Sequence, residues 1–342
     1  MKRNNWGLLF LAIGVALFVG YIVYSNPFAV LTEVGRFDPL MFLAAIGVNY
    51  VGLVFLSASW HILLRSLGFK NGFWESIQVS FVGLFVVWLL PFPSGFELVR
   101  AYLIRDKEGG NIGKAVSSVI FSKVYYFISF GLMISLAAII VRFVNGSDIP
   151  IQLGFIWFAV LFAISNMVMF AVILTPSIMM WIYDRSPEWL NTFMQKRVYS
   201  VDFGLSSFDQ FVNEIQDSIM TLRKRPLENL ISLFLVGFHW STGAITAYMV
   251  SRSLNETINF WVIVLIYAVI EFIQQLNFLI PSGLGIVDAG LAGALVVVGV
   301  PLEVAGAISL LTRLATYWFE LFLCGFVSFR FGYREVLRSY LS

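Results

Sequence analysis

The residues of this sequence that are most able to do chemistry are seven charged side chains inside long apolar stretches. A charge at the centre of a bilayer costs roughly 2.5–3.5 kcal/mol on insertion scales, so such residues are rare and commonly functional. Acids and bases are nearly balanced here, which allows internal ion pairs or a charged ligand. The seven are Glu97, Arg100, Lys123, Glu271, Asp288, Arg313 and Glu320.

Two Pro-Ser-Gly segments precede two of these acids, in "LPFPSGFELVRAYLI" and "FLIPSGLGIVDAGLA". Proline cannot continue a helix, and glycine adopts backbone angles that other residues avoid. A helix that begins after such a break presents free N–H groups, which favour an anion. At membrane depth a break is tolerated only where it is buried in protein or lines a cavity. We therefore expect Ser282, Gly283 and Gly285 to contribute to a binding cavity.

The cations near these breaks are candidates for binding phosphate. We expect Arg100, Lys123 and Arg313 to bind the phosphate, and Glu97 and Asp288 to orient them or to contact a cationic group of the ligand. Internal pairing is the alternative, because Glu97 and Arg100 are one helical turn apart on one face. A long basic side chain can also reach the membrane interface.

A polar stripe precedes the second break. Glu271, Gln274 and Asn277 follow one another at intervals of one helical turn on an otherwise apolar segment. We expect these three residues to line the same site. For Glu320, in contrast, we expect an internal ion pair or a position at the interface.

Metal, cofactor and nucleic-acid chemistry have no support in the sequence. His61 and His239 are far apart, each lies beside a tryptophan, and we expect both to be packed or interfacial. Cys324 is the single cysteine. No phosphate-binding GxxxxGK[ST] motif occurs, so we expect no internal ATP drive and no cofactor. The formal net charge of +2 does not indicate a polyanionic partner.

The composition predicts an all-α, polytopic membrane helix bundle. Hydrophobic residues make up 59% of the chain and charged residues 12%, whereas soluble domains are about 45–50% apolar and about 25% charged. We expect about 7–9 membrane segments, two of them broken or re-entrant. The clear segments are 6–24, 40–64, 115–142, 153–174, 227–250, 258–279 and 303–329, and the ambiguous ones are 74–90 and 283–299.

Basic residues predict a multi-pass cell-membrane protein with a cytoplasmic N-terminus. We expect four parts: a first transmembrane half (1–174), a cytoplasmic connector (175–226), a second half (227–329) and a basic cytoplasmic tail (330–342). The tail reaches the cytoplasm if one ambiguous segment spans the membrane, and the other side if both re-enter. Segment 6–24 resembles a signal peptide but lacks a cleavage site, so we expect an uncleaved helix.

The connector contains "SSFDQFVNEIQDSIMTLRKRP", which predicts an amphipathic helix on the membrane surface or against the bundle. Acids come early and bases late, as the helix dipole favours. Ser206 or Ser207 is expected to cap its start. A simple connector and a regulatory element both fit. The apolar positions are Phe208, Phe211, Val212, Ile215, Ile219 and Leu222.

The two halves indicate an internal repeat. Glu97 precedes Lys123 by 26 residues, and Asp288 precedes Arg313 by 25 residues. Each acid follows a Pro-Ser-Gly segment, and each base lies in the next apolar helix. The sequence leaves open whether the repeat is parallel or inverted.

These motifs resemble the flippase-like, lysylphosphatidylglycerol synthase transmembrane-region family, over nearly the whole chain. The likeness rests on "PSGFELVRAYLI", Lys123, "LIPSGLGIVDAGL", Gly299-Val300 and "LLTRLATYW". The resemblance implies a membrane protein that handles lipid headgroups. The family often has arginine at the place of Lys123, an acid at Tyr126 and glutamate at Asp288. No aminoacyl-transfer domain follows residue 329, so we do not expect a complete synthase.

The leading hypothesis is a flippase-like protein that translocates a phospholipid or lipid-linked headgroup. Its expected partner is a membrane lipid with an anionic or zwitterionic headgroup, with no nucleic acid, and a homo-oligomer is compatible with the sequence. One alternative is a membrane scaffold for a separate cytoplasmic synthase. Another is an intramembrane transferase that acts on a lipid-linked substrate.

Overall fold

The computed structural model describes residues 26–89, 95–108, 112–143, 208–274 and 283–330, with isolated positions between 16 and 23 and between 161 and 185. Within them the chain forms helices and turns without a strand, so the all-α prediction is confirmed. Within the described ranges, four helices are long and apolar enough to cross a membrane. They are α3 (Pro39–Ser66), α6 (Ile112–Phe143), α11 (Pro226–Ser253) and a continuous run of α14 (Leu302–Arg313), η3 (Leu314–Trp318) and α15 (Phe319–Arg330).

The expected segments 6–24 and 153–174 lie almost entirely outside the described residues, as do most of 175–207 and the tail from 331 onward. The division of the chain into four parts therefore stays a prediction. The connection 25–39 contains a short helix that the sequence did not predict, α2 (Pro27–Val34), which packs against α14.

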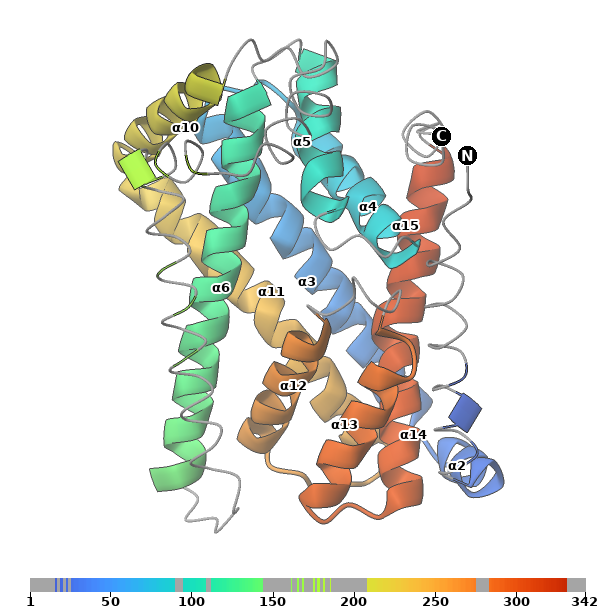
Figure 1. Cartoon of the computed structure of the whole chain (residues 1–342). Helices are drawn as coiled ribbons and strands as arrows, with labels where there is room; N and C mark the ends of the chain where they lie inside the picture. The colour runs from blue at the N-terminus through green and yellow to red at the C-terminus, as the bar shows by residue number, and fades with distance from the viewer. Residues whose placement is uncertain are drawn as a thin grey trace.

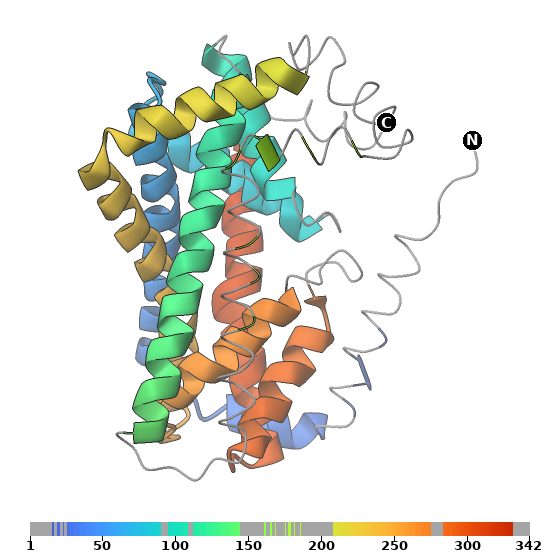
Figure 2. The ribbon, with the colours of Figure 1, turned by 60° about the vertical axis from the view of Figure 1, so that its left-hand side comes forward.

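Four shorter helices form two hairpins. In the first, α4 (Phe73–Leu89) packs against α5 (Gly95–Glu108), and in the second, α12 (Phe260–Gln274) packs against α13 (Ile286–Val297). The described part of α12 has 15 residues and is about 22 Å long. Figures 1 and 2 show the first hairpin in the upper part of the bundle and the second in the lower part. The described arms of each hairpin run back to the end of the bundle from which that hairpin starts, as in a re-entrant segment, and the two hairpins start from opposite ends.

This arrangement bears on two expectations about topology. Segment 258–279 was expected to span; its described part, α12, forms one arm of the second hairpin, and residues 275–279 lie outside the described residues. As a result α14 begins at the lower end, and Arg330 ends at the same end as Arg65 of α3 (Figure 1). Helix α15 therefore ends on the side of the bundle that carries the connector helix. We had expected the opposite side for the case in which both ambiguous segments re-enter.

The two hairpins are equivalent in sequence position as well as in shape. Glu97 and Asp288 each lie two residues after the first residue of α5 and α13. Lys123 and Arg313 each lie eleven residues after the first residue of α6 and α14. Because the hairpins enter from opposite ends, the internal repeat is inverted.

Helices α3 and α11 cross closely through the middle of the bundle. A Cβ on Gly52 would lie 2.9 Å from Cβ of Thr242, so only glycine permits this approach. The hydroxyls of Ser59 and Ser232 are 2.6 Å apart. Small residues and hydroxyl contacts of this kind hold membrane helices together, because lipid gives no hydrophobic drive for their association.

The amphipathic helix of the connector is α10 (Phe208–Arg223), which lies across the upper end of the bundle (Figure 2). Its apolar residues Val212, Ile215 and Leu222 are buried. Glu214 Oε2 accepts a hydrogen bond of 2.8 Å from the backbone N–H of Gly113, in the first turn of α6. Of the two expected positions, α10 therefore takes the one against the bundle. The expected caps Ser206 and Ser207 lie outside the described residues.

Candidate functional site

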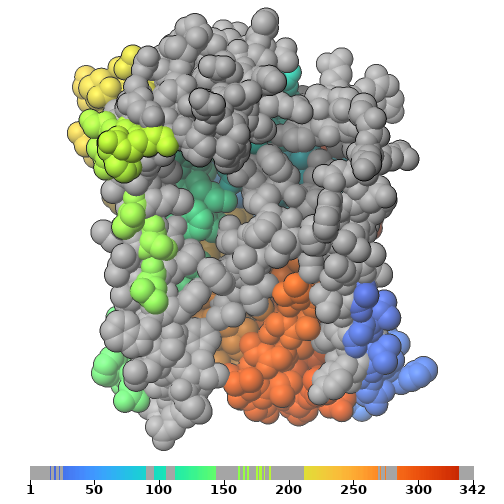
Figure 3. Space-filling model, in the orientation of Figure 1, coloured from blue at the N-terminus to red at the C-terminus, as the bar shows by residue number. Residues whose placement is uncertain are grey.

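A cavity of ≈ 210 Å³ lies among the long helices and the two hairpins. Five of the residues that we expected to bind a ligand line it, although they come from four separate helices. In the space-filling view (Figure 3), the second hairpin, in orange, forms the lower part of the visible face. The five residues are Glu97, Arg100, Lys123, Gln274 and Arg313.

The first ion pair joins the first hairpin to α6. Lys123 Nζ lies 2.7 Å from Glu97 Oε1, with side-chain exposures of 35% and 17% respectively. Glu97 therefore pairs with Lys123 rather than with Arg100, its neighbour on α5. The second oxygen, Glu97 Oε2, is buried and has no hydrogen-bond partner among the described residues.

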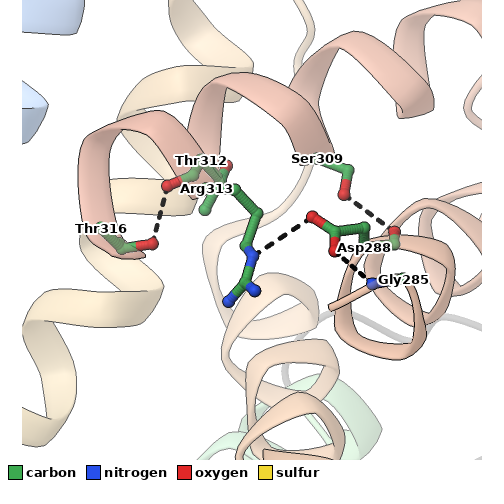
Figure 4. Close-up of polar contacts among 6 residues, drawn as sticks. All are labelled: Gly285, Asp288, Ser309, Thr312, Arg313 and Thr316. Atoms are coloured by element: carbon green, nitrogen blue, oxygen red, sulfur yellow. Dashed lines mark hydrogen bonds and ion pairs between the residues drawn. The ribbon is translucent and has the colours of Figure 1, made fainter. Parts of the chain in front are cut away.

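The second ion pair joins the second hairpin to α14 and is deeply buried. Arg313 Nε lies 3.2 Å from Asp288 Oδ1, with side-chain exposures of 4% and 3%. Asp288 also accepts a hydrogen bond of 2.9 Å from Gly285 N–H through Oδ2, and its carbonyl accepts one of 2.8 Å from Ser309 Oγ (Figure 4). The carboxylate thus joins the start of α13 to α14.

The glycines of the second break are required by its geometry. Gly283 and Gly285 have φ of 60° and 79°, a region that other residues adopt only with strain. One N–H of this break, that of Gly285, already donates to Asp288, so the carboxylate occupies part of the anion site that we expected. The start of α13 is capped by its own carboxylate.

Arg100 has a different environment from the other two cations. Its side chain is almost completely buried, with the guanidinium carbon 3.9 Å from the ring centre of Trp60 and 4.5 Å from that of Phe96. Nε and Nη2 have no hydrogen-bond partner among the described residues. Arg100 is one of the residues that line the cavity, and these two nitrogens are buried in its wall.

Glu320 is a cavity residue whose position the sequence did not predict. Asn49 Nδ2 donates to Glu320 Oε1 at 2.9 Å, and Trp88 Nε1 donates to Oε2 at 3.2 Å. Asn49 also reaches the carbonyl of Ala315 at 3.3 Å, inside the π-helical turn η3. A π-turn within a helix often marks a functional site, because it frees a backbone carbonyl. A lone asparagine in the apolar run of α3 was the available signal.

The two histidines differ. His61 Nδ1 lies 2.9 Å from Ser76 Oγ, so it is packed between α3 and α4 as expected. His239 lines the cavity near Tyr126, with 6.3 Å between ring centres, and is not simply packed. Within the described residues, no three His, Cys, Asp or Glu side chains are placed to hold a metal ion.

Part of the expected site lies outside the described residues. This holds for Asn277, for Ser282 and for the side chain of Glu271, whose backbone belongs to α12. Gln274, at the end of the same helix, is described and lines the cavity. Asp288 lies beyond Arg313 rather than on the cavity wall.

The family described as the lysylphosphatidylglycerol synthase TM region matches residues 11–324. A UPF0104 membrane protein of Pyrococcus horikoshii is 22% identical, over 93% of this chain and 95% of its own length. A UPF0104 membrane protein of Methanocaldococcus jannaschii is 23% identical, over 95% and 90% of the two chains. One of Methanothermobacter thermautotrophicus is 21% identical, over 93% and 90%.

Proposed function

Since this chain belongs to the family of the lysylphosphatidylglycerol synthase transmembrane region, we propose that it binds the headgroup of a phospholipid or lipid-linked molecule and moves it across the bilayer. One observation carries the proposal. A cavity with charges of both signs lies where two re-entrant hairpins from opposite ends approach each other. A polar headgroup crossing a membrane needs such a site at this depth.

The inverted repeat supports movement as well as binding. In transporters with this symmetry, the substrate site lies between the repeats, and each repeat opens toward one side. Here each hairpin is tied to the following helix by one ion pair, Glu97–Lys123 or Asp288–Arg313. Loosening one hairpin at a time would give the cavity access to one side at a time.

We place the upper end of the bundle in the cytoplasm of a cell-membrane protein. Basic residues gather there, at Arg65, Lys70, Lys114 and the Arg223–Arg225 run. An excess of lysine and arginine marks cytoplasmic loops. The N-terminus and the connector are then cytoplasmic as well.

Lipid binding is tested by native mass spectrometry of gently extracted protein. Wild type is compared with Arg100→Ala, Lys123→Ala and Arg313→Ala. We expect one lipid class to be enriched in the wild type and depleted in the variants. The same non-selective lipid in all four proteins would show that these charges are structural, and would favour a scaffold for a separate synthase.

Translocation is tested in vesicles that contain the purified protein and a fluorescent analogue of the retained lipid. We expect the fraction of analogue that dithionite can reduce from outside to rise above that of protein-free vesicles. The Arg100→Ala variant should return this fraction to the protein-free level. A wild type indistinguishable from empty vesicles would contradict translocation while leaving lipid binding intact.

A further inference from the structure

We infer that Arg100 alone, of the three cations on the cavity wall, binds the anionic group of the ligand, and that this group is a monoanion of the kind a lipid phosphodiester supplies. The inference deepens the proposed function and rests on it. It departs from the expectation that Arg100, Lys123 and Arg313 share one phosphate. The three cations differ in their carboxylate partners: Lys123 and Arg313 each form an ion pair, whereas Arg100 forms none with a described residue.

Lys123 and Arg313 are already neutralised within the protein. Lys123 Nζ is 2.7 Å from Glu97, and Arg313 Nε is 3.2 Å from Asp288. In the second pair the carboxylate of Asp288 is also held in place by its own helix, because it accepts a hydrogen bond from the N–H of Gly285 (Figure 4). A carboxylate held in this way cancels the field of its cation, so neither pair attracts an anion strongly.

Arg100 forms no ion pair within the described residues, and only the charge of Glu97, one helical turn away, offsets part of its own. Its side chain is 1% exposed, and two of its nitrogens lack a hydrogen-bond partner. A buried charge without a partner is costly, and the cost is removed when an anion enters. The nearby carboxylate, Glu97, is committed to Lys123.

The rings of Trp60 and Phe96 prepare Arg100 for this role. The guanidinium lies over both rings, at 3.9 and 4.5 Å from their centres. A flat guanidinium packs between rings while its edge still donates N–H groups, which lysine does not do. The rings therefore fix the plane of the guanidinium group, and its N–H edge can still donate to a planar or tetrahedral oxyanion.

One uncompensated cation limits the charge that the cavity accepts. A phosphodiester carries one negative charge, whereas a phosphomonoester carries about 1.5 to 2 near pH 7. The buried Oε2 of Glu97 lacks a donor and lies one helical turn from Arg100. A hydroxyl or ammonium group next to the phosphodiester would satisfy it.

The test measures ligand-induced shifts of the unfolding midpoint in detergent. The probes are dioctanoylphosphatidylglycerol, dioctanoylphosphatidic acid, uncharged dioctanoylglycerol and inorganic phosphate. We expect the diester to stabilise the wild type most, the monoester less, and the other two not at all. Equal stabilisation by phosphate or by dioctanoylglycerol would overturn the lipid-anion assignment, and a monoester that matches the diester would overturn the monoanion.

Double variants that remove a cation together with its carboxylate distinguish the contribution of Arg100 to binding from that of the two ion pairs. Arg100→Gln should raise the apparent dissociation constant for the diester more than tenfold, and Arg100→Lys should not rescue it. Glu97→Gln/Lys123→Gln and Asp288→Asn/Arg313→Gln remove a cation together with its carboxylate, and should change the constant less than threefold. Lys123→Gln alone should weaken binding, because it frees Glu97 to face Arg100. Arg252→Gln, on the exposed end of α11, is the control.

The outcomes distinguish this inference from the proposed function. If Arg100→Gln binds the diester normally while a double variant loses it, the assignment to Arg100 is wrong but lipid binding stands. If no lipid probe shifts the wild-type midpoint, the proposed function fails. A structural role for Arg100 predicts a lower midpoint for Arg100→Gln without ligand. An anion site predicts an unchanged or higher one.

Discussion

The buried pair Asp288–Arg313 shows how one side chain can serve several structural purposes. Its carboxylate meets a guanidinium on α14 and caps the backbone of its own helix at Gly285. Both side chains are at most 4% exposed, so neither has water to replace a lost partner. The pair Glu97–Lys123, at 35% and 17% exposure for Lys123 and Glu97, is partly screened and should tolerate change better.

Replacing one residue of the buried pair should destabilise the protein more than replacing both. We expect Asp288→Asn and Arg313→Gln each to lower the free energy of unfolding by about 3–5 kcal/mol, because each leaves a buried group unmatched. The double variant should recover part of this loss. A double-mutant cycle from thermal unfolding in detergent measures the coupling. Additive losses would show that the two residues do not interact energetically.

The break before α13 should depend on the backbone freedom of Gly285. Its φ of 79° predicts that Gly285→Ala costs about 1–2 kcal/mol. Gly293→Ala is the matched control on the same helix, where an added Cβ meets nothing within 4 Å. We expect that control to raise stability by about 0.5–1 kcal/mol. The unfolding midpoints of the two variants should therefore move in opposite directions.

Among the helices, α10 has an identifiable attachment to the bundle. It buries one apolar face and places Glu214 at the N-terminus of α6, the helix that carries Lys123. An acid at that end stabilises both the free N–H groups and the helix dipole. The connector is thereby linked to a wall of the cavity.

Removal of this cap should loosen α10. We expect Glu214→Ala to cost about 1 kcal/mol and to speed tryptic cleavage at Arg223, Lys224 and Arg225. Asp217→Ala is the control, since Asp217 lies on the exposed side of the same helix. Quantified cleavage rates check the prediction. Equal rates for the two variants would mean that the apolar face alone holds α10.

The crossing of α3 and α11 should tolerate no side chain at Gly52. A Cβ there would lie 2.9 Å from Cβ of Thr242, so we expect Gly52→Val to cost at least about 1–3 kcal/mol through overpacking. Gly47→Val is the control on the same helix, where an added Cβ meets nothing within 4 Å. The unfolding midpoint of Gly47→Val should stay close to that of the wild type.

In the molecule as a whole, the inverted hairpins decide which loops share a side of the membrane. The first hairpin begins and ends at the upper end with α10, and the second begins and ends at the lower end with α2 (Figures 1 and 2). The inner ends of the described arms, at Trp88, Phe96 and Gln274, line the cavity. Symmetry of this kind gives equivalent access from two sides.

Cysteine labelling in intact cells tests this topology. In a Cys324→Ser background, we expect Lys70→Cys and Lys114→Cys to react with an impermeant maleimide only after permeabilisation. Thr257→Cys and Val297→Cys, at the two ends of the second hairpin, should react without it. Labelling of Val297→Cys only after permeabilisation would show that α12 spans the membrane.

Much of the architecture follows from local patterns in the sequence. Apolar runs, bounded by charges and prolines, predicted α3, α6 and α11 to within a few residues, because helix formation in lipid depends on neighbours along the chain. The spacing of Glu97 and Lys123 matched that of Asp288 and Arg313, which indicated the repeat. The need for glycine at 285 followed from the break itself.

Partner choice and orientation depended on contacts between residues distant in the chain. The local sequence does not show whether Glu97 pairs with Arg100 or with Lys123. Arg100 is one helical turn away on the same helix, and Lys123 lies on the next helix. Trp60 meets Arg100, and Asn49 meets Glu320, only after α3 has packed against α5 and the π-turn. Helix formation is a local property, whereas pairing, burial and the direction of the hairpins arise from packing between distant segments.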